Sequence, residues 1–158
     1  MGWLSSLTNK DSSASDSILQ ALGKSQAVIE FEPNGTILTA NSNFLNAMGY
    51  RLDEIRGKHH SIFVDADYAA SGEYQEFWAK LSRGEFFSDE FKRVDKAGKT
   101  VWIQATYNPV LNKHNQVEKV IKFATDVTQQ KLENADFQGQ IEAIGKSQAV
   151  IEFNMDGT

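Results

Sequence analysis

The side chains best suited to holding a cofactor are two adjacent histidines, His59 and His60, and a tryptophan further along the chain, Trp78. An imidazole titrates near neutral pH and can ligate a metal or a heme iron. An indole ring offers a flat apolar wall and one N–H donor. Because neighbouring side chains point in different directions, we expect at most one of the two histidines to face a common pocket.

Other residue patterns argue against catalysis. Ser61 follows His60 directly, but neighbouring side chains diverge and no third group is evident to orient the base. Asp89 and Glu90 are adjacent on a predicted strand, which sends them to opposite faces. The chain has no phosphate-binding glycine loop and no cysteine, so thiolate catalysis and cysteine-ligated metal sites are excluded. We predict that the chain is not an enzyme.

The residues before His59 predict a β-hairpin and two short helices. Apolar alternation over residues 27–31 and 36–38 flanks the turn Pro33-Asn34-Gly35, whose residue types favour a tight turn. Asn41 or Ser42 can cap a helix that ends at Gly49, and residues 52–55 form a second one.

After His60, Ser71 can cap an amphipathic helix that carries Trp78 and ends at Gly84. Three strands follow, over residues 86–94, 100–111 and 117–127. The order ββααααβββ predicts an α+β fold, with a five-stranded antiparallel sheet, short helices on one face, and flanking N- and C-terminal helices.

Composition limits the partners of the chain. With 158 residues, 41% of them hydrophobic and 23% charged, it suits one globular domain with extensions. A net charge of −5 without a basic face argues against nucleic acid. No stretch approaches the roughly 20 apolar residues of a membrane span. The lack of cysteine fits a reducing compartment, and we predict a cytoplasmic location.

An internal repeat defines the expected organisation. Residues 23–31 recur unchanged as residues 145–153 in the sequence GKSQAVIEF, which predicts the start of a second copy of the fold. We therefore expect four parts. They are an N-terminal tether and short helix (1–25), a folded domain (26–128), a connecting helix (129–144) and the truncated start of a second repeat (145–158).

Several motifs together resemble a PAS sensor domain. They fall in family order across residues 26–128, and lie at residues 29–38, 43–50, 53–58, 95–99 and 126–128. The histidine stretch and residues 77–88 look most like the flavin-binding PAS domains of aerotaxis and redox sensors. The tandem repeat resembles the N-terminal half of soluble methyl-accepting chemotaxis proteins. The resemblance implies a sensory domain that binds FAD and reports redox state or oxygen to a chemotaxis-type output.

The resemblance also implies a cofactor site, to which we assign Trp78, His60, Arg93, Phe44 and Asn43. Arg93 stands where the family has an asparagine on the first strand after the helix, and it can also donate to a carbonyl edge. Two alternatives remain open: heme b with His60 as the axial ligand, and a ligand-free PAS module that only dimerises. We expect a homodimer formed through the flanking helices and a signalling domain further along the protein.

Overall fold

The structure is a computed structural model that describes residues 16–135. The predicted tether (1–15), the end of the predicted connecting helix (136–144) and the second repeat (145–158) lie outside the described residues. The chain divides into two units, Met1–Asp126 and Val127–Thr158, of which the first holds the sheet and its helices. In the second unit, residues 128–135 are helical.

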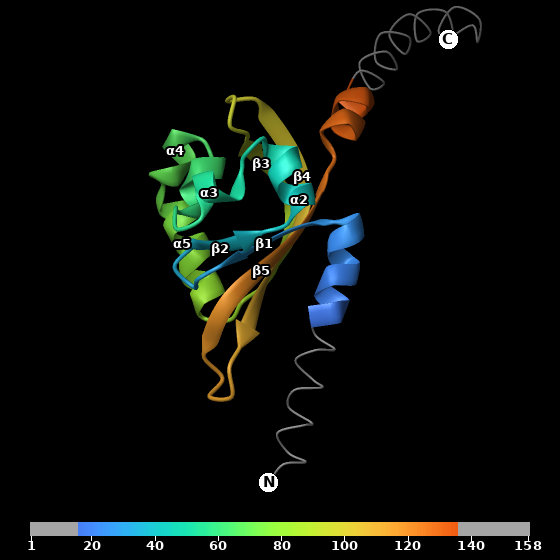
Figure 1. The fold of residues 1–158 in the computed structure, drawn as a ribbon. Coiled ribbons are helices and arrows are strands. Elements are labelled where there is room, and N and C mark those ends of the chain that lie inside the picture. Colours follow the sequence, from blue (N-terminus) through green and yellow to red (C-terminus); the bar gives the residue numbers. More distant parts are fainter. Residues whose placement is uncertain (1–15, 136–158) are drawn as a thin grey trace, which may run out of the picture. The chain divides into compact units, whose positions relative to one another are not determined.

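A five-stranded antiparallel sheet organises the first unit, in the order β2-β1-β5-β4-β3 (Figure 1). The predicted α+β fold and element order are confirmed, with a 3₁₀ helix, η1, added after α3. The strands are β1 (Ala27–Phe31), β2 (Ile37–Ala40), β3 (Phe87–Val94), β4 (Thr100–Leu111) and β5 (Val117–Asp126). The helices are α2 (Ser42–Met48), α3 (Leu52–Ile55), η1 (His60–Phe63), α4 (Ala66–Ala69) and α5 (Gly72–Ser82).

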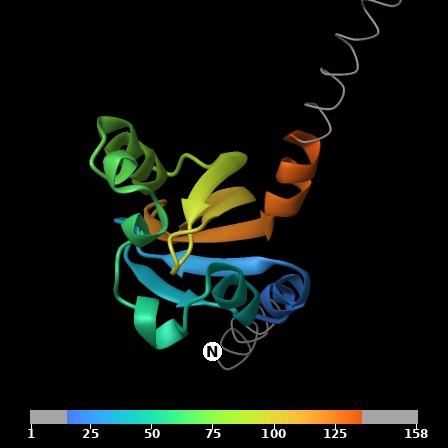
Figure 2. The same ribbon diagram turned by 90° about the horizontal axis from the view of Figure 1, so that it is seen from above.

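The core lies on the face of the sheet that the helices cover. Alternate residues of the strands point into it, so Ile29 and Phe31 of β1 are fully buried. Helix α5 adds its apolar stripe, and Leu81 is fully buried there. Figure 1 shows α3, α4 and α5 gathered on this side of the sheet, and Figure 2 shows the same arrangement from above. Each fully buried side chain of this size contributes about 1.5–3 kcal/mol.

An N-terminal helix over residues 16–25 lies against the opposite, outer face of the sheet (Figure 1). Asn41 ties its end to the domain, since the amide group donates to the carbonyls of Gly23 (3.1 Å) and Gln26 (2.9 Å). Its carbonyl oxygen accepts from the backbone N–H of Val28 (2.9 Å) and caps α2 by accepting from Phe44 (3.0 Å). One side chain thus joins the N-terminal helix, β1 and α2.

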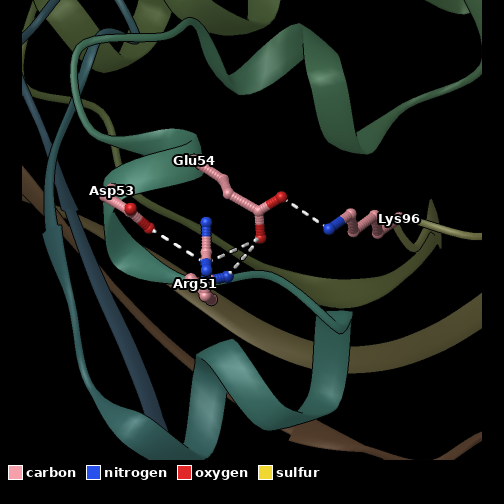
Figure 3. Close-up of polar contacts among 4 residues, drawn as sticks. All are labelled: Arg51, Asp53, Glu54 and Lys96. Carbon is pink, nitrogen blue, oxygen red and sulfur yellow. Dashed lines mark hydrogen bonds and ion pairs between the residues drawn. The ribbon is translucent and has the colours of Figure 1, made fainter.

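Surface charges link α3 to the turn between β3 and β4 (Figure 3). The Lys96 side-chain amine lies 2.5 Å from the Glu54 carboxylate. The backbone N–H of Lys96 also donates to the Met48 carbonyl. Arg51 lies near both Asp53 (3.3 Å) and Glu54 (3.9 Å). The hydrogen bond from Lys96 lowers the pKa of Glu54. Because these groups are solvent-exposed, the contacts position two loops more than they stabilise the fold.

We expect Asn41→Ala to lower the free energy of unfolding by about 2–4 kcal/mol, because it removes a helix cap and three further partly buried hydrogen bonds. Urea denaturation followed by circular dichroism measures the change. Asn43→Ala is the matched control, because its exposed amide donates to the same two carbonyls. Its loss should cost less than about 1 kcal/mol. Equal costs for the two variants would contradict the central role of Asn41.

Candidate functional site

The histidine stretch is held against the β1–β2 turn by a short run of backbone hydrogen bonds. The backbone N–H of Ile37 donates to the Lys58 carbonyl (2.7 Å), and the backbone N–H of His60 donates to the Gly35 carbonyl (2.9 Å). Gly35 has φ +95°, and a Cβ there would lie 2.6 Å from the His59 ring and 3.0 Å from Trp78. The turn therefore requires glycine both for its conformation and for close approach, and it fixes where the two histidines point.

His60 points inward and His59 does not share its position. The His60 side chain is fully buried, with Nδ1 2.8 Å from the Tyr74 hydroxyl and Nε2 3.0 Å from the Tyr107 hydroxyl. The His59 ring lies nearer the surface, where Nε2 is 2.8 Å from the Asn34 carbonyl and Nδ1 accepts from Ser61 N–H. The prediction that the two rings diverge is confirmed.

Arg93, on strand β3, extends the hydrogen bonds of His60 and Tyr107. It is 3% exposed, and Nη2 donates to the Tyr107 hydroxyl at 2.9 Å. One set of donor and acceptor roles fits all three bonds: Tyr107 accepts from Arg93 and donates to His60 Nε2, which leaves Nδ1 to donate to Tyr74. Arg93, Tyr107, His60 and Tyr74 thus form one buried chain of hydrogen bonds.

The electrostatics of this row keep His60 neutral. Burial lowers the pKa of His60 well below its usual value, and the positive charges of Arg93 and Lys122, then His59, add to the effect. Burial likewise lowers the pKa of Lys122 well below its usual value, with Arg93 adding to it. Burial raises the pKa of the Tyr107 hydroxyl, which remains a neutral donor.

Trp78 lies across the His60 ring, with ring centroids 5.3 Å apart. Its side chain is buried, and Nε1 has no hydrogen-bond partner among the described residues. Trp78 also borders a pocket of about 780 Å³ beside α4 and α5. The pocket is lined by aliphatic, aromatic and polar side chains, namely His59, Ser61, Val64, Ala66, Ala69, Ala70, Tyr74, Gln75 and Trp78. We call it the Trp78 pocket.

Of the five residues assigned from sequence, only Trp78 lines the Trp78 pocket, and the histidine that lines it is His59 instead of the assigned His60. Trp78 and His60 are in contact, and Arg93 reaches His60 through Tyr107. Phe44 is buried elsewhere in the core, where it packs against Phe63 at 5.3 Å between ring centroids. The exposed Asn43 is directed to the end of the N-terminal helix, where its amide donates to Gly23 and Gln26.

Two residues of the row, Tyr74 and Tyr107, and the neighbouring buried Lys122 were missed in the sequence. Tyr74 precedes Trp78 by one helical turn, so helical periodicity could have placed both on one face. Tyr107 follows the inward alternation of β4, from Val101 through Ala105. Lys122 gave no signal, because a lysine within a strand ordinarily reads as solvent-facing.

No group of three metal-binding side chains comes together within residues 16–135. Over the same residues, no helix has the length and apolar character needed to cross a membrane.

We expect the stability of the domain to fall between pH 6.5 and pH 5 because of His60. In the unfolded chain, His60 takes up a proton near pH 6.5, whereas in the folded protein its lowered pKa prevents this. The unfolded state then binds more protons, so the free energy of unfolding decreases by up to about 1.4 kcal/mol per pH unit as pH falls. Urea denaturation at pH 7 and pH 5.5 measures this.

His60→Gln should remove this part of the pH dependence, because glutamine keeps a donor and an acceptor but does not titrate. His114→Gln is the control, since His114 lies exposed in the β4–β5 loop. If the wild type and His60→Gln lost equal stability over this pH range, His60 would not be the responsible group.

Comparisons with known proteins agree with this geometry. The family model of the PAS fold matches residues 37–124. The chain is 43% identical over 139 residues to biofilm dispersion protein BdlA of Pseudomonas aeruginosa, covering 88% of this chain and 33% of that protein. It is 25% identical over 96 residues to the aerotaxis receptor of Escherichia coli, covering 61% of this chain and 19% of that receptor. The chain therefore spans a third or less of the length of these curated relatives.

Solved structures with low sequence identity share the fold. One is a light-oxygen-voltage domain studied with a flavin analogue, at TM-score 0.60 and 20% identity, covering 80% of this chain and 96% of that chain. Another is an RNA-binding light-oxygen-voltage receptor, at TM-score 0.64 and 19% identity, covering 85% of this chain and 38% of that chain. The sheet order, the match of the family model and these likenesses lead to one conclusion: this chain belongs to the PAS fold family.

Proposed function

We propose that this domain is a sensory module that binds a flavin, FAD, and reports redox state or oxygen to a chemotaxis-type output. The observation that carries the proposal is the buried Trp78 Nε1, which has no partner among the described residues and belongs to a side chain bordering a pocket of about 780 Å³. A buried donor without a partner is costly, and a ligand acceptor would remove the cost. The name of the aerotaxis receptor among the relatives points in the same direction.

The lining of the Trp78 pocket suits a flavin. A flavin has a flat apolar edge and a polar edge, so its site needs aromatic or aliphatic walls and a few polar groups. Ala66, Ala69 and Trp78 supply the walls, and Ser61 and Gln75 supply hydrogen-bonding groups. A volume of about 780 Å³ is within the range of small-molecule sites.

The histidines fit heme less well. An axial ligand needs a free ring nitrogen to bind iron. Both nitrogens of His60 are hydrogen-bonded to tyrosine hydroxyls, and both nitrogens of His59 are also engaged. Heme binding would require breaking one of these bonds, whereas a flavin in the Trp78 pocket would need no histidine nitrogen.

In this proposal Trp78 donates its indole N–H to the ligand, and the His60 ring packs against the indole ring. A bound flavin would supply reversible redox chemistry. His60 stays neutral and keeps the orientation that the two tyrosine hydroxyls impose. A change in what Trp78 donates to would reach His60, and through Tyr107 it would reach Arg93 on β3. The sheet and its flanking helices would then carry the signal.

We expect freshly purified protein to show the visible spectrum of a flavin and to release FAD on denaturation. Trp78→Phe keeps an aromatic wall but removes the N–H, so FAD affinity should fall about tenfold, as the loss of one buried hydrogen bond predicts. Trp102→Phe is the matched control, since Trp102 lies on the outer face of β4 and should leave affinity unchanged. A protein that stays colourless with added FAD, or that binds heme instead, would contradict the proposal.

A second candidate is a PAS module that acts by dimerising. It is favoured by Ile18 and Leu22 of the N-terminal helix, which are 60% and 38% exposed. The homodimer through the flanking helices and the cytoplasmic location remain predictions. The double variant Ile18→Gln/Leu22→Gln should shift a dimer to monomer in sedimentation equilibrium, while Leu111→Gln serves as a control on an exposed leucine of β4, outside both flanking helices. A wild type that is monomeric at all concentrations would exclude this function for the chain.

A further inference from the structure

Among residues 16–135, basic side chains are buried in the interior of the domain, but no carboxylate is buried with them. Within residues 16–135, the buried titratable groups of charged residue types are His60, Arg93 and Lys122, at 0%, 3% and 1% exposure. His60 and Lys122 can avoid the cost of a buried charge by losing a proton. An arginine cannot, because its guanidinium stays protonated under all ordinary conditions. Arg93 is thus a permanent buried charge without a buried carboxylate.

The guanidinium of Arg93 has one buried N–H group without a partner among the described residues. Nη1 donates to the Lys92 carbonyl and Nη2 to the Tyr107 hydroxyl, both at 2.9 Å. Nε is buried and has no partner among the described residues. The Phe91 ring lies 4.8 Å from the guanidinium carbon and supports its flat face. The edge formed by Nε and the second hydrogen of Nη2 matches the two oxygens of a carboxylate.

A separate small pocket adjoins this arginine. Its volume is about 280 Å³, and its lining residues are Asp65, Tyr68, Glu90, Phe91, Lys92 and Arg93. It shares no lining residue with the Trp78 pocket. We call it the Arg93 pocket.

The rim of the Arg93 pocket limits the charge of a ligand. Asp65 is paired with Lys92 at 3.4 Å, and both side chains are about half exposed. Glu90 is exposed as well. Because the rim residues Asp65, Glu90 and Lys92 together carry a net negative charge while one inner guanidinium attracts anions, a single negative charge is favoured over two or three.

We propose that the Arg93 pocket binds a small monocarboxylate side-on to Arg93. This inference goes beyond the flavin site, because it involves a different pocket and holds whether or not a flavin is bound. A ligand in the Arg93 pocket would alter the hydrogen bonds next to the Trp78 pocket, since Arg93 and His60 share the Tyr107 hydroxyl. A carboxylate neutralises the charge nearest this shared hydroxyl. The domain would then respond to a small organic acid as well as to its cofactor.

Thermal unfolding of the wild-type protein in a chloride buffer free of other anions tests the proposal. Propionate should raise Tm by about 4–8 °C once its concentration exceeds Kd roughly fivefold, and Tm should keep rising with the logarithm of its concentration above Kd. Propionamide has nearly the same shape without the charge and should leave Tm unchanged. Inorganic phosphate should shift Tm much less than propionate, because the rim acids repel a dianion. Equal shifts with propionate and propionamide, or with propionate and phosphate, would overturn the proposal, as would no shift with propionate.

Substitution at Arg93 locates the site. Arg93→Met should abolish the propionate shift, and the ligand-free variant should be at least as stable as wild type, because an uncompensated buried charge is replaced by an apolar side chain. Arg83→Met is the matched control, since it removes an exposed arginine paired with Glu76 and Glu85, and it should keep the full shift. Arg93→Lys keeps the charge but loses the planar edge, so its propionate affinity should fall at least tenfold. A full propionate shift in Arg93→Met would overturn the assignment.

Discussion

The burial of the His60 imidazole between two tyrosine hydroxyls is the constraint on which the rest of the site depends. An imidazole can be fully buried only if both nitrogens are satisfied, and here Tyr74 from α5 and Tyr107 from β4 satisfy them. These bonds join the helix that carries Trp78 to the central part of the sheet. Because the partners come from different elements, moving either element breaks a buried hydrogen bond.

This arrangement also explains why the interior can hold basic residues. Lys122 lies over the rings of Tyr107 and Phe44, at 4.9 Å and 5.6 Å from their centroids, and its pKa is lowered by burial. His60 is neutral for the same reason. The charge of Arg93 lies beside the Phe91 ring and an adjacent pocket. A sensor requires an element with two arrangements of similar free energy, and a polar core with unsatisfied donors supplies one more readily than a fully apolar core.

Two pockets meet this row of hydrogen bonds from different sides. The Trp78 pocket adjoins it at the helices, and the Arg93 pocket adjoins it at β3. The outer face of the sheet carries the N-terminal helix, whose end is tied by Asn41 to β1 and α2. A change in the core can thus reach this helix through β1, which contributes Phe31 to the contacts of both His60 and Trp78. The His60–Trp78 contact and the N-terminal helix thus both adjoin strand β1.

Much of this architecture was encoded locally. The turn residues Asn34 and Gly35, the cap Asn41 and the alternation of β4 act over a few neighbouring residues, so the order of elements could be predicted from sequence, whereas the PAS fold was predicted from the resemblance of several motifs to that family. The contact of His60 with Trp78 was also within reach, because the family resemblance placed both at the cofactor site. Tertiary structure alone decided that Tyr107 and Arg93 complete the row, that Asn43 turns to the N-terminal helix, and that Lys122 is buried. These outcomes depend on which strands become neighbours and which face the helices cover, and residues far apart in sequence determine both.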